Sequence, residues 1–311
     1  MNILVTGARG FVGNYLIKDL LAIGCNVVAP NSSELDVSRP SDFDKYRNMH
    51  FQAVIHLAGL LMINQHKPED YFRVNSFGTF NVLEFCRTEK ISTLIYTMTH
   101  SDVNGMDHVK STLRPYDPQI FTTGGWEDNS IPFISSKIAA ADMIEAYNRK
   151  HVIRGVILRV ANIRGYGSND TKYNSPFHQF IKKAKAGETI EVWGNPPKTK
   201  RDFIYVKDVC SAIIAAIECQ SAVGYFNVGS GIGLTIDDEI KFITQVFGNG
   251  RSKIVYRRDI PEVRKISCVF NIMKTQMVLN WSPKYSYVEG LLDFKKEEAA
   301  MTSNNSGGWR D

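Results

Sequence analysis

The first residues of the chain constrain its fold more than any other stretch. A short apolar run, Ile3-Leu4-Val5, leads directly into a turn that contains Gly7, Gly10 and Gly13, and an amphipathic segment at 14–21 follows. A strand, glycines at this spacing and a helix together form the βα unit that binds dinucleotides. The first glycine permits a tight turn, the second lets backbone N–H groups approach a pyrophosphate, and the third lets the helix pack on the strand. We therefore expect a dinucleotide site at the start of the chain.

Strand and helix patterns alternate after this unit. Apolar runs recur at 26–29, 53–57, 94–97 and 155–160, with amphipathic stretches at 70–88 and 135–150 among them. Such alternation predicts an α/β fold with a doubly wound parallel sheet. The pattern loosens beyond residue 163. We expect a Rossmann domain over residues 1–163, to which 203–230 returns, and a smaller mixed C-terminal domain over most of 164–311 that binds substrate.

The composition is that of an ordinary globular protein with a mild basic excess. The 311 residues include 37 Lys and Arg against 32 Asp and Glu, a formal net charge of +5. Without dense basic runs, this charge suits an anionic small molecule and not a nucleic acid. The five cysteines are scattered and are expected to be free thiols in a reducing compartment, with no metal site. Because the chain opens on a strand and no apolar run approaches about 18 residues, we expect no membrane span and a cytoplasmic location.

The end of the second predicted strand bears on which dinucleotide is bound. A site specific for NAD usually places Asp or Glu there, against the adenosine 2′-hydroxyl. Here the chain reads Pro30-Asn31-Ser32-Ser33, with two hydroxyls and an amide in place of a carboxylate that would repel a 2′-phosphate. Arg9 in the glycine turn is a candidate partner for that phosphate, although a solvated loop arginine would look the same. The pattern favours NADP(H) slightly over NAD(H).

Further motifs follow in order along the chain. They are the glycine turn, His56-Leu57-Ala58-Gly59, Val74-Asn75 with Gly78-Thr79, Phe133 with Lys137, Arg159-Val160-Ala161-Asn162, Arg201 to Val206, and Tyr225 to Gly229. With this series the chain resembles the extended short-chain dehydrogenase/reductase superfamily, and within it the NAD(P)-dependent epimerase/dehydratase family that acts on nucleotide sugars. The resemblance covers residues 1–298 and implies a Rossmann domain, a smaller C-terminal domain and a sugar held between them.

The resemblance also implies where the cofactor is held. The stretch Leu35-Asp36-Val37 is similar to a strand end whose Asp lies near the adenine ring, and His56 is expected to be a packed strand-end histidine and not a base. The expected cofactor contacts are Gly7, Arg9, Gly10, Phe11, Val12, Gly13, Asn31, Asp36, Val37, Leu57, Ala58, Gly59, Asn75 and Lys137.

In the family, catalysis uses a Tyr-x-x-x-Lys pair and a Ser or Thr. The lysine holds the nicotinamide ribose and lowers the tyrosine pKa, and the tyrosinate exchanges a proton with the C4 oxygen of the sugar as hydride moves. Lys137 matches the lysine and Thr99 the hydroxyl residue, although alignment from Gly105 would put His100 there instead. Phe133 stands where the tyrosine is expected. Since phenylalanine has no hydroxyl, losing this acid/base is expected to cost about 10²–10⁴ in rate.

Three explanations fit Phe133. It could be an engineered knock-out that traps substrate, the mark of a natural enzyme with another base, or the mark of a natural binder. The first is favoured, because every surrounding motif is intact.

On the substrate side, the resemblance implies contacts to a nucleotide diphosphate from Asn162, Arg201 and Arg264. Guanidinium groups suit a pyrophosphate because each offers several fixed donors to anionic oxygens. Either arginine could instead be a surface ion-pair residue. Val192 is expected to wall the base and His100 to lie on the substrate side. Since base contacts vary within the family, UDP, GDP, CDP and dTDP all stay open.

The implied activity is hydride transfer at C4 of a nucleotide sugar by a 4-epimerase or 4-ketoreductase, impaired by Phe133. A 4,6-dehydratase is less favoured, because elimination needs an additional acid/base pair and only Asp102 is present in the corresponding stretch. The alternative from another class is a cofactor-binding sensor or scaffold with a dead site, which would not need the diphosphate residues. Apolar faces at 70–88 and 135–147 predict a homodimer through four helices, although core packing explains these faces equally well.

Overall fold

Six strands form the central sheet of the computed structural model, which describes residues 1–62, 66–103, 130–167, 175–193, 199–259 and 267–303. The strands lie in the order β2-β1-β3-β4-β5-β9, and every neighbouring pair is parallel. Their bounds are Asn2–Thr6 (β1), Asn26–Val28 (β2), Ala53–His56 (β3), Thr93–Thr99 (β4), Arg154–Val160 (β5) and Gly224–Val228 (β9). The winding direction reverses between β1 and β3, and ligands of such sheets bind there, at the carboxyl ends of the strands.

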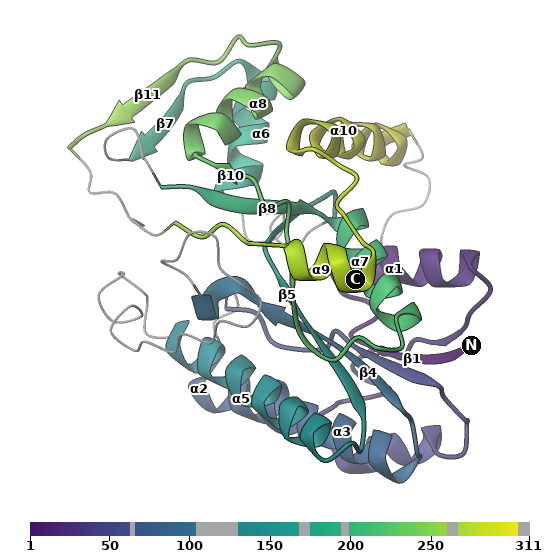
Figure 1. The fold of residues 1–311 in the computed structure, drawn as a ribbon. Coiled ribbons are helices and arrows are strands. Elements are labelled where there is room, and N and C mark those ends of the chain that lie inside the picture. Colours follow the sequence, from purple (N-terminus) through teal and green to yellow (C-terminus); the bar gives the residue numbers. More distant parts are fainter. Residues whose placement is uncertain (63–65, 104–129, 168–174, 194–198, 260–266, 304–311) are drawn as a thin grey trace.

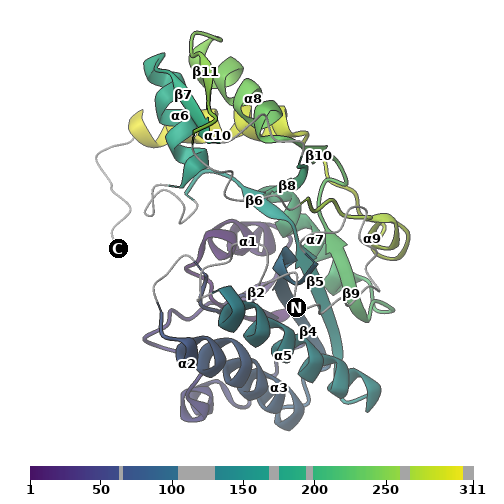
Figure 2. The ribbon, with the colours of Figure 1, turned by 90° about the vertical axis from the view of Figure 1, so that its left-hand side faces the viewer.

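Helices cover both faces of this sheet (Figures 1 and 2). One face carries α1 (Phe11–Ala22) and α7 (Val206–Glu218), and the other carries α3 (Gly78–Thr88) and α5 (Ser130–Arg149). Because successive side chains of a strand point to opposite faces, β4 supplies Ile95 to the core under α1 and α7 and Leu94 to the core under α3 and α5. These two apolar layers confirm the predicted doubly wound α/β fold.

A second, smaller lobe lies at the top of Figure 1. It is built from α6 (Pro176–Ala186), β7 (Ile190–Trp193), α8 (Ile236–Gly248), β11 (Ile254–Arg257) and α10 (Tyr287–Ser303). These elements share one apolar core. A three-stranded sheet of β6 (Asn162–Arg164), β8 (Arg201–Tyr205) and β10 (Gly233–Leu234) runs between the two lobes. The short elements that complete the order are η1 (Pro40–Tyr46), η3 (His100–Val103) and α9 (Met273–Leu279).

The amphipathic stretch at 70–88 is not one regular helix. It divides into α2 (Pro68–Tyr71), a π-helical turn η2 (Phe72–Phe77) and α3. Widened turns of this kind are rare and are frequently found at functional sites. Here η2 contains Asn75, one of the predicted cofactor residues.

Helix α5 begins at Ser130, ahead of the expected start at 135. Pro132 fits within its first turn, where the missing N–H would have no intrahelical partner in any case. Phe133 therefore lies in the first turn of the helix, with Lys137 one turn further on.

None of the helices in the described part of the chain is long and apolar enough to span a membrane.

Candidate active site

The glycine turn brings the start of α1 to the carboxyl end of β1. Gly7 has a φ of +71°, and a Cβ there would lie 2.5 Å from the backbone nitrogen of Ala58, so only glycine fits. A Cβ at Gly13 would overlap the preceding turn at 2.4 Å. The first helical hydrogen bond of α1 runs from Asn14 N to Gly10 O at 3.0 Å. The N–H groups ahead of it have no acceptor within the helix, so this end suits a pyrophosphate.

Three other predicted cofactor residues lie on this turn. Arg9 is exposed. The ring of Phe11 meets that of Tyr15 edge to face, with centroids 5.9 Å apart. Val12 packs against the core under α1. Phe11 and Val12 are half-buried, whereas the exposed side chain of Arg9 is accessible to an anionic group.

The end of β3 forms a second wall beside the turn. Residues 57–59 follow the strand and are half-buried. Asn75 holds the next residue, since its Oδ1 accepts a hydrogen bond from Leu60 N at 2.8 Å and its Nδ2 donates to Leu60 O at 3.3 Å. A Cβ at Gly59 would lie 3.0 Å from both Asn75 Oδ1 and Lys137 Nζ. The structure thus brings three predicted residues, Gly59, Asn75 and Lys137, to one point.

His56, at the end of β3, is fully buried. Its Nε2 donates to Thr79 Oγ1 at 3.0 Å, because the Thr79 hydroxyl gives its own proton to Asn75 O at 2.6 Å. Its Nδ1 then accepts from Thr6 Oγ1 at 2.7 Å. Burial lowers the pKa of His56 to about 3, so the ring stays neutral. His56 is therefore a packed strand-end histidine, as the sequence indicated.

Lys137 is buried with its ammonium group at the end of β4. Its Nζ donates to Thr97 O at 3.5 Å and lies 4.9 Å from the centroid of the Tyr96 ring. Burial lowers the pKa of Lys137 from its ordinary 10.5 to about 8. The ammonium group therefore lies beside Gly59, next to the glycine turn, where a bound dinucleotide would pass.

Phe133 is buried in contact with Tyr71. The two rings meet edge to face with centroids 6.0 Å apart, and Phe133 is 5% exposed. The start of α5 is fixed to η2 through Ser136, whose Oγ donates to Phe133 O at 2.7 Å and accepts from Asn75 Nδ2 at 3.0 Å. The phenyl ring thus lies on the same helix face and one turn away from Lys137, in the arrangement that the motif predicts.

Thr99 ends β4, and its hydroxyl closes the following turn. It donates to Ser101 Oγ at 3.0 Å and accepts from Ser101 N at 3.1 Å. By strand alternation Thr99 shares the sheet face of Ile95, while Tyr96 faces the core under α5. His100 opens η3 directly afterwards. The assignment of the catalytic hydroxyl position to Thr99, with His100 as the neighbouring alternative, stays a prediction.

Asp102, the carboxylate weighed for a dehydratase, is held in an ion pair. Its Oδ2 lies 2.6 Å from Arg159 Nη2, and both of its oxygens accept from Arg159 Nε, at 3.0 and 3.1 Å. Burial raises the pKa of Asp102, and the adjacent guanidinium opposes that rise. No local sequence signal pointed to this pair, because 57 residues separate its members.

The turn that follows β2 contains a carboxylate, that of Glu34, directly after the stretch at 30–33. Glu34 Oε2 accepts from Asn31 N at 2.8 Å, while Asn31 Oδ1 accepts from Glu34 N at 3.1 Å and from Ser33 N at 2.9 Å. This reciprocal pattern is that of a capping box, here in a turn that no helix directly follows, and its spacing, Asn31-x-x-Glu34, is readable in the sequence. Glu34 therefore adds a carboxylate to the turn that contains Asn31 to Ser33, and the expected lean towards NADP(H) stays a prediction.

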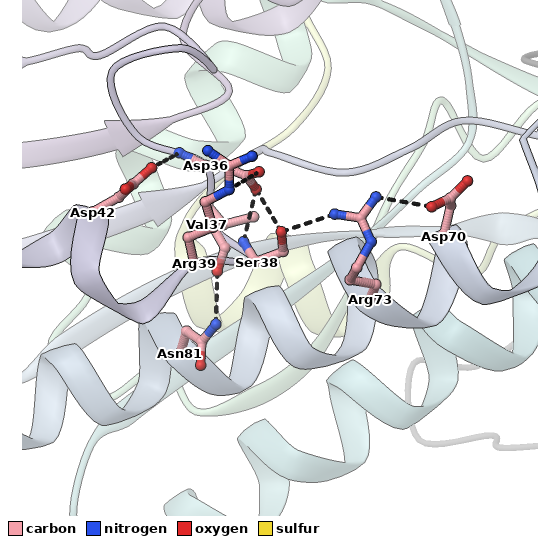
Figure 3. A network of polar contacts seen from close by, with 8 residues as sticks. All are labelled: Asp36, Val37, Ser38, Arg39, Asp42, Asp70, Arg73 and Asn81. Atoms are coloured by element: carbon pink, nitrogen blue, oxygen red, sulfur yellow. Dashed lines mark hydrogen bonds and ion pairs between the residues drawn. The ribbon is translucent and has the colours of Figure 1, made fainter.

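Asp36 and Val37, predicted to lie near the adenine, belong to a polar network that joins this loop to η2 (Figure 3). Asp36 Oδ1 accepts from Ser38 N at 3.0 Å and from Ser38 Oγ at 2.7 Å. Arg73 of η2 donates to Ser38 Oγ at 3.1 Å, and Asn81 donates to Val37 O at 2.9 Å. Arg73 and Asn81 thus hold the loop in place, although neither stood out in the sequence.

The predicted substrate residues do not all lie together. Asn162 Nδ2 donates to Asp202 O at 3.0 Å, next to Arg201 at the start of β8, so Asn162 and Arg201 are neighbours between the lobes. Val192 is 5% exposed and lies within the core of the second lobe. Arg264 lies outside the described residues.

A model of the NAD dependent epimerase/dehydratase family matches residues 3–229 of the chain. Among curated relatives, GDP-L-fucose synthase 1 of Arabidopsis thaliana is 24% identical over 304 residues, which cover 93% of this chain and 90% of the relative. The similarity therefore extends along nearly the whole of both chains.

Solved structures with this fold include enzymes in complex with their ligands. The UDP-glucose 4-epimerase of Thermotoga maritima, solved with UDP-glucose, superposes with a TM-score of 0.78 at 22% identity and covers 97% of this chain and 100% of its own. RMD from Pseudomonas aeruginosa, solved with NADPH, gives a TM-score of 0.77 at 22% identity, with coverage of 96% and 98%. At these identities the likeness shows the shared fold.

Proposed function

Because the chain belongs to the NAD dependent epimerase/dehydratase family, we propose that it binds a nucleotide sugar and a dinucleotide for hydride transfer at C4, as a 4-epimerase or a 4-ketoreductase. The observation that carries the proposal is the position of Lys137. Its Nζ is buried against Thr97 O and Gly59, beside the glycine turn and at the carboxyl edge of the sheet. A buried lysine at this edge suits a ribose diol, for which an ammonium group offers several donors.

The residues present fit a dinucleotide. At Gly7 and Gly13 a Cβ would collide with backbone, so glycine there permits the tight turn and the close packing of α1, whose first N–H groups are directed to where a pyrophosphate would bind. A bound nicotinamide would supply the hydride donor or acceptor. Lys137 would hold its ribose, and Asn75 would keep the 59–60 turn in position beneath it.

We further propose that NADP(H) is slightly preferred over NAD(H). Arg9 is exposed on the glycine turn and supports this preference as a partner for a 2′-phosphate. The carboxylate of Glu34 at the end of β2 works against it. The RMD structure that resembles this chain is described with NADPH. The preference is therefore expected to be small, since Arg9 would attract a 2′-phosphate and Glu34 would repel it.

On the substrate side, Asn162, Arg201 and Arg264 are proposed to hold the diphosphate and Val192 to border the base. Residues 1–163 with 203–230 would form the cofactor domain, and most of 164–311 the sugar-nucleotide domain. The relatives act with UDP or GDP sugars according to their names, so these two classes are the first to test.

Phe133 is proposed to weaken turnover without removing either binding site. Its ring keeps the packing of a tyrosine but offers no proton to the C4 oxygen. The 4,6-dehydratase alternative is disfavoured because the carboxylate of Asp102 is already paired with Arg159. A sensor with a dead site remains the alternative if no turnover can be restored.

Native mass spectrometry of the purified protein, followed by assays with UDP-glucose and GDP-L-fucose and with both reduced and oxidised dinucleotides, tests the proposal. We expect a bound dinucleotide and turnover that Phe133→Tyr increases. Failure of the protein and of its Phe133→Tyr form to bind any dinucleotide at millimolar concentration would refute it.

A further inference from the structure

Asp102 and Arg159 form an ion pair beside the carboxyl end of β4. Arg159 is 0% exposed and Asp102 is 6% exposed, and three hydrogen bonds of 2.6 to 3.1 Å join them. Two charges removed from water in this way are seldom a net source of stability, because the desolvation cost is comparable to the attraction. An apolar pair would fill the same space at lower cost. Such a pair therefore calls for an explanation in terms of geometry.

The guanidinium of Arg159 is anchored on its other side by the next strand. Its Nη1 donates to Asn227 Oδ1 at 3.4 Å, and its Cζ lies 5.0 Å from the centroid of the Tyr225 ring. Asn227 in turn donates from Nδ2 to Asn271 O at 3.1 Å. Arg159 is thus held by β9 and by the chain at 271, so its position is independent of the turn that it contacts.

Asp102 belongs to that turn. It lies in η3, three residues beyond Thr99, and Ser101 between them is buried. The hydroxyl of Thr99 exchanges two hydrogen bonds with Ser101, at 3.0 and 3.1 Å. A fixed Asp102 carboxylate therefore holds its neighbour Ser101 in place. Ser101 in turn holds the Thr99 hydroxyl and the backbone of His100, and so sets the direction of the His100 side chain.

We propose that Asp102 and Arg159 form a positioning pair that sets the turn from Thr99 to Val103 against the sheet, and so aims the polar group that meets the sugar. This inference rests on the proposed function for its catalytic consequence. In this role the pair would contact neither cofactor nor sugar and would exchange no proton. Its effect passes through Thr99 or His100.

The same strand supplies a matched control. Arg154 lies at the opposite end of β5 and donates to Ala216 O at 3.0 Å and to Cys219 O at 2.8 Å. Like Arg159 it is held by several hydrogen bonds, but it lies at the amino edge of the sheet, away from the site. Replacement of either arginine by lysine removes a fork of hydrogen bonds, and only one of the two replacements disturbs the turn.

The first test compares Asp102→Asn, Arg159→Lys and Arg154→Lys in the Phe133→Tyr protein. We expect kcat to fall about ten- to a hundredfold for the first two, because small displacements of a reacting group cost this much. The Kd for NADPH should stay within about twofold, and kcat of Arg154→Lys should change less than about twofold even if its Tm falls. If the three variants lose kcat only in proportion to Tm, the pair is structural and the proposal fails.

The second test does not depend on turnover. Imidazole resonances of histidine-labelled protein are recorded against pH, and that of His100 is identified by its loss in His100→Gln. The chemical shift and titration midpoint of His100 should move in Asp102→Asn and Arg159→Lys and stay fixed in Arg154→Lys. An unmoved His100 in all variants overturns the positioning role. Absence of turnover with UDP-glucose and GDP-L-fucose in the Phe133→Tyr parent would count against the proposed function alone.

Discussion

The ring of Phe133 meets the ring of Tyr71 edge to face, and the Tyr71 hydroxyl donates to Leu61 O at 3.3 Å. Tyr71 is fully buried and burial raises its pKa, which disfavours a tyrosinate there, so we expect it not to replace the missing acid/base. Phe133→Tyr should therefore raise kcat by about 10²–10⁴ with little change in the Kd for NADPH. Steady-state assays with UDP-glucose and GDP-L-fucose measure this gain. Phe133→Leu keeps an apolar side chain without a hydroxyl and should show no gain in kcat. Equal kcat values for Phe133→Tyr and Phe133→Leu would mean that another group moves the proton.

The buried ammonium group of Lys137, which is needed at the site, should lower the free energy of unfolding at neutral pH. Burial lowers its pKa from 10.5 to about 8, so between these values the unfolded chain binds more protons than the folded one. The free energy of unfolding then rises with pH across this window, and the penalty is complete below pH 8. Lys137→Met should raise the free energy of unfolding at pH 7 by about 2–3 kcal/mol. This gain in the free energy of unfolding should shrink as the pH approaches 10.5.

Urea unfolding at pH 7 and at about pH 9.5 measures this difference, and NADPH titration of the same variant should show weaker binding. Lys137→Arg retains a charge in the buried site and should give no gain in stability at either pH. A gain in Lys137→Met that is equal at both pH values would show that side-chain packing, and not the charge, is responsible.

Local patterns were enough to predict the sheet and the position of Lys137, because both depend on short-range spacing. Glycines three residues apart after a strand, and a lysine one turn after Phe133, retain their meaning in any chain of this fold. The capping box of Asn31 and Glu34 is local too, but it becomes relevant to the cofactor only when the turn folds back onto the end of β2. The ion pair of Asp102 and Arg159 depends on the pairing of β4 with β5, which no single stretch encodes.

The π-helical turn η2 could not be predicted from the sequence, for a different reason. Regular and π-helical turns place apolar residues at almost the same intervals, so the stretch at 70–88 predicts one helix either way. What selects the wider turn is the fit of Asn75 between Leu60 and Ser136, a contact among three separate segments.

Glu34 should limit the preference for NADPH. Its carboxylate accepts from Asn31 N in the turn after β2, and a 2′-phosphate about 4 Å from it would be repelled by about 1 kcal/mol in water. Glu34→Gln keeps an acceptor for the capping box. We expect the affinity for NADPH relative to NADH to rise about three- to tenfold. Fluorescence titrations with both dinucleotides measure the ratio, and Glu188→Gln in the second lobe controls for the loss of one negative charge. An unchanged ratio would place the 2′ group elsewhere.

The outer face of η2 and α3 should form a homodimer interface. Phe72, Phe77 and Phe80 are 39%, 65% and 40% exposed on these two elements, and exposed apolar side chains that gather on one face mark interaction sites. Phe77→Asp would bury an unpaired charge in a paired interface, so light scattering after size exclusion should show the mass falling from twice 35.1 kDa to 35.1 kDa. Met277→Asp on α9 adds the same charge at a side chain that is 77% exposed, and it should leave the mass unchanged. A parent protein of 35.1 kDa at micromolar concentration would rule out a stable dimer through this face.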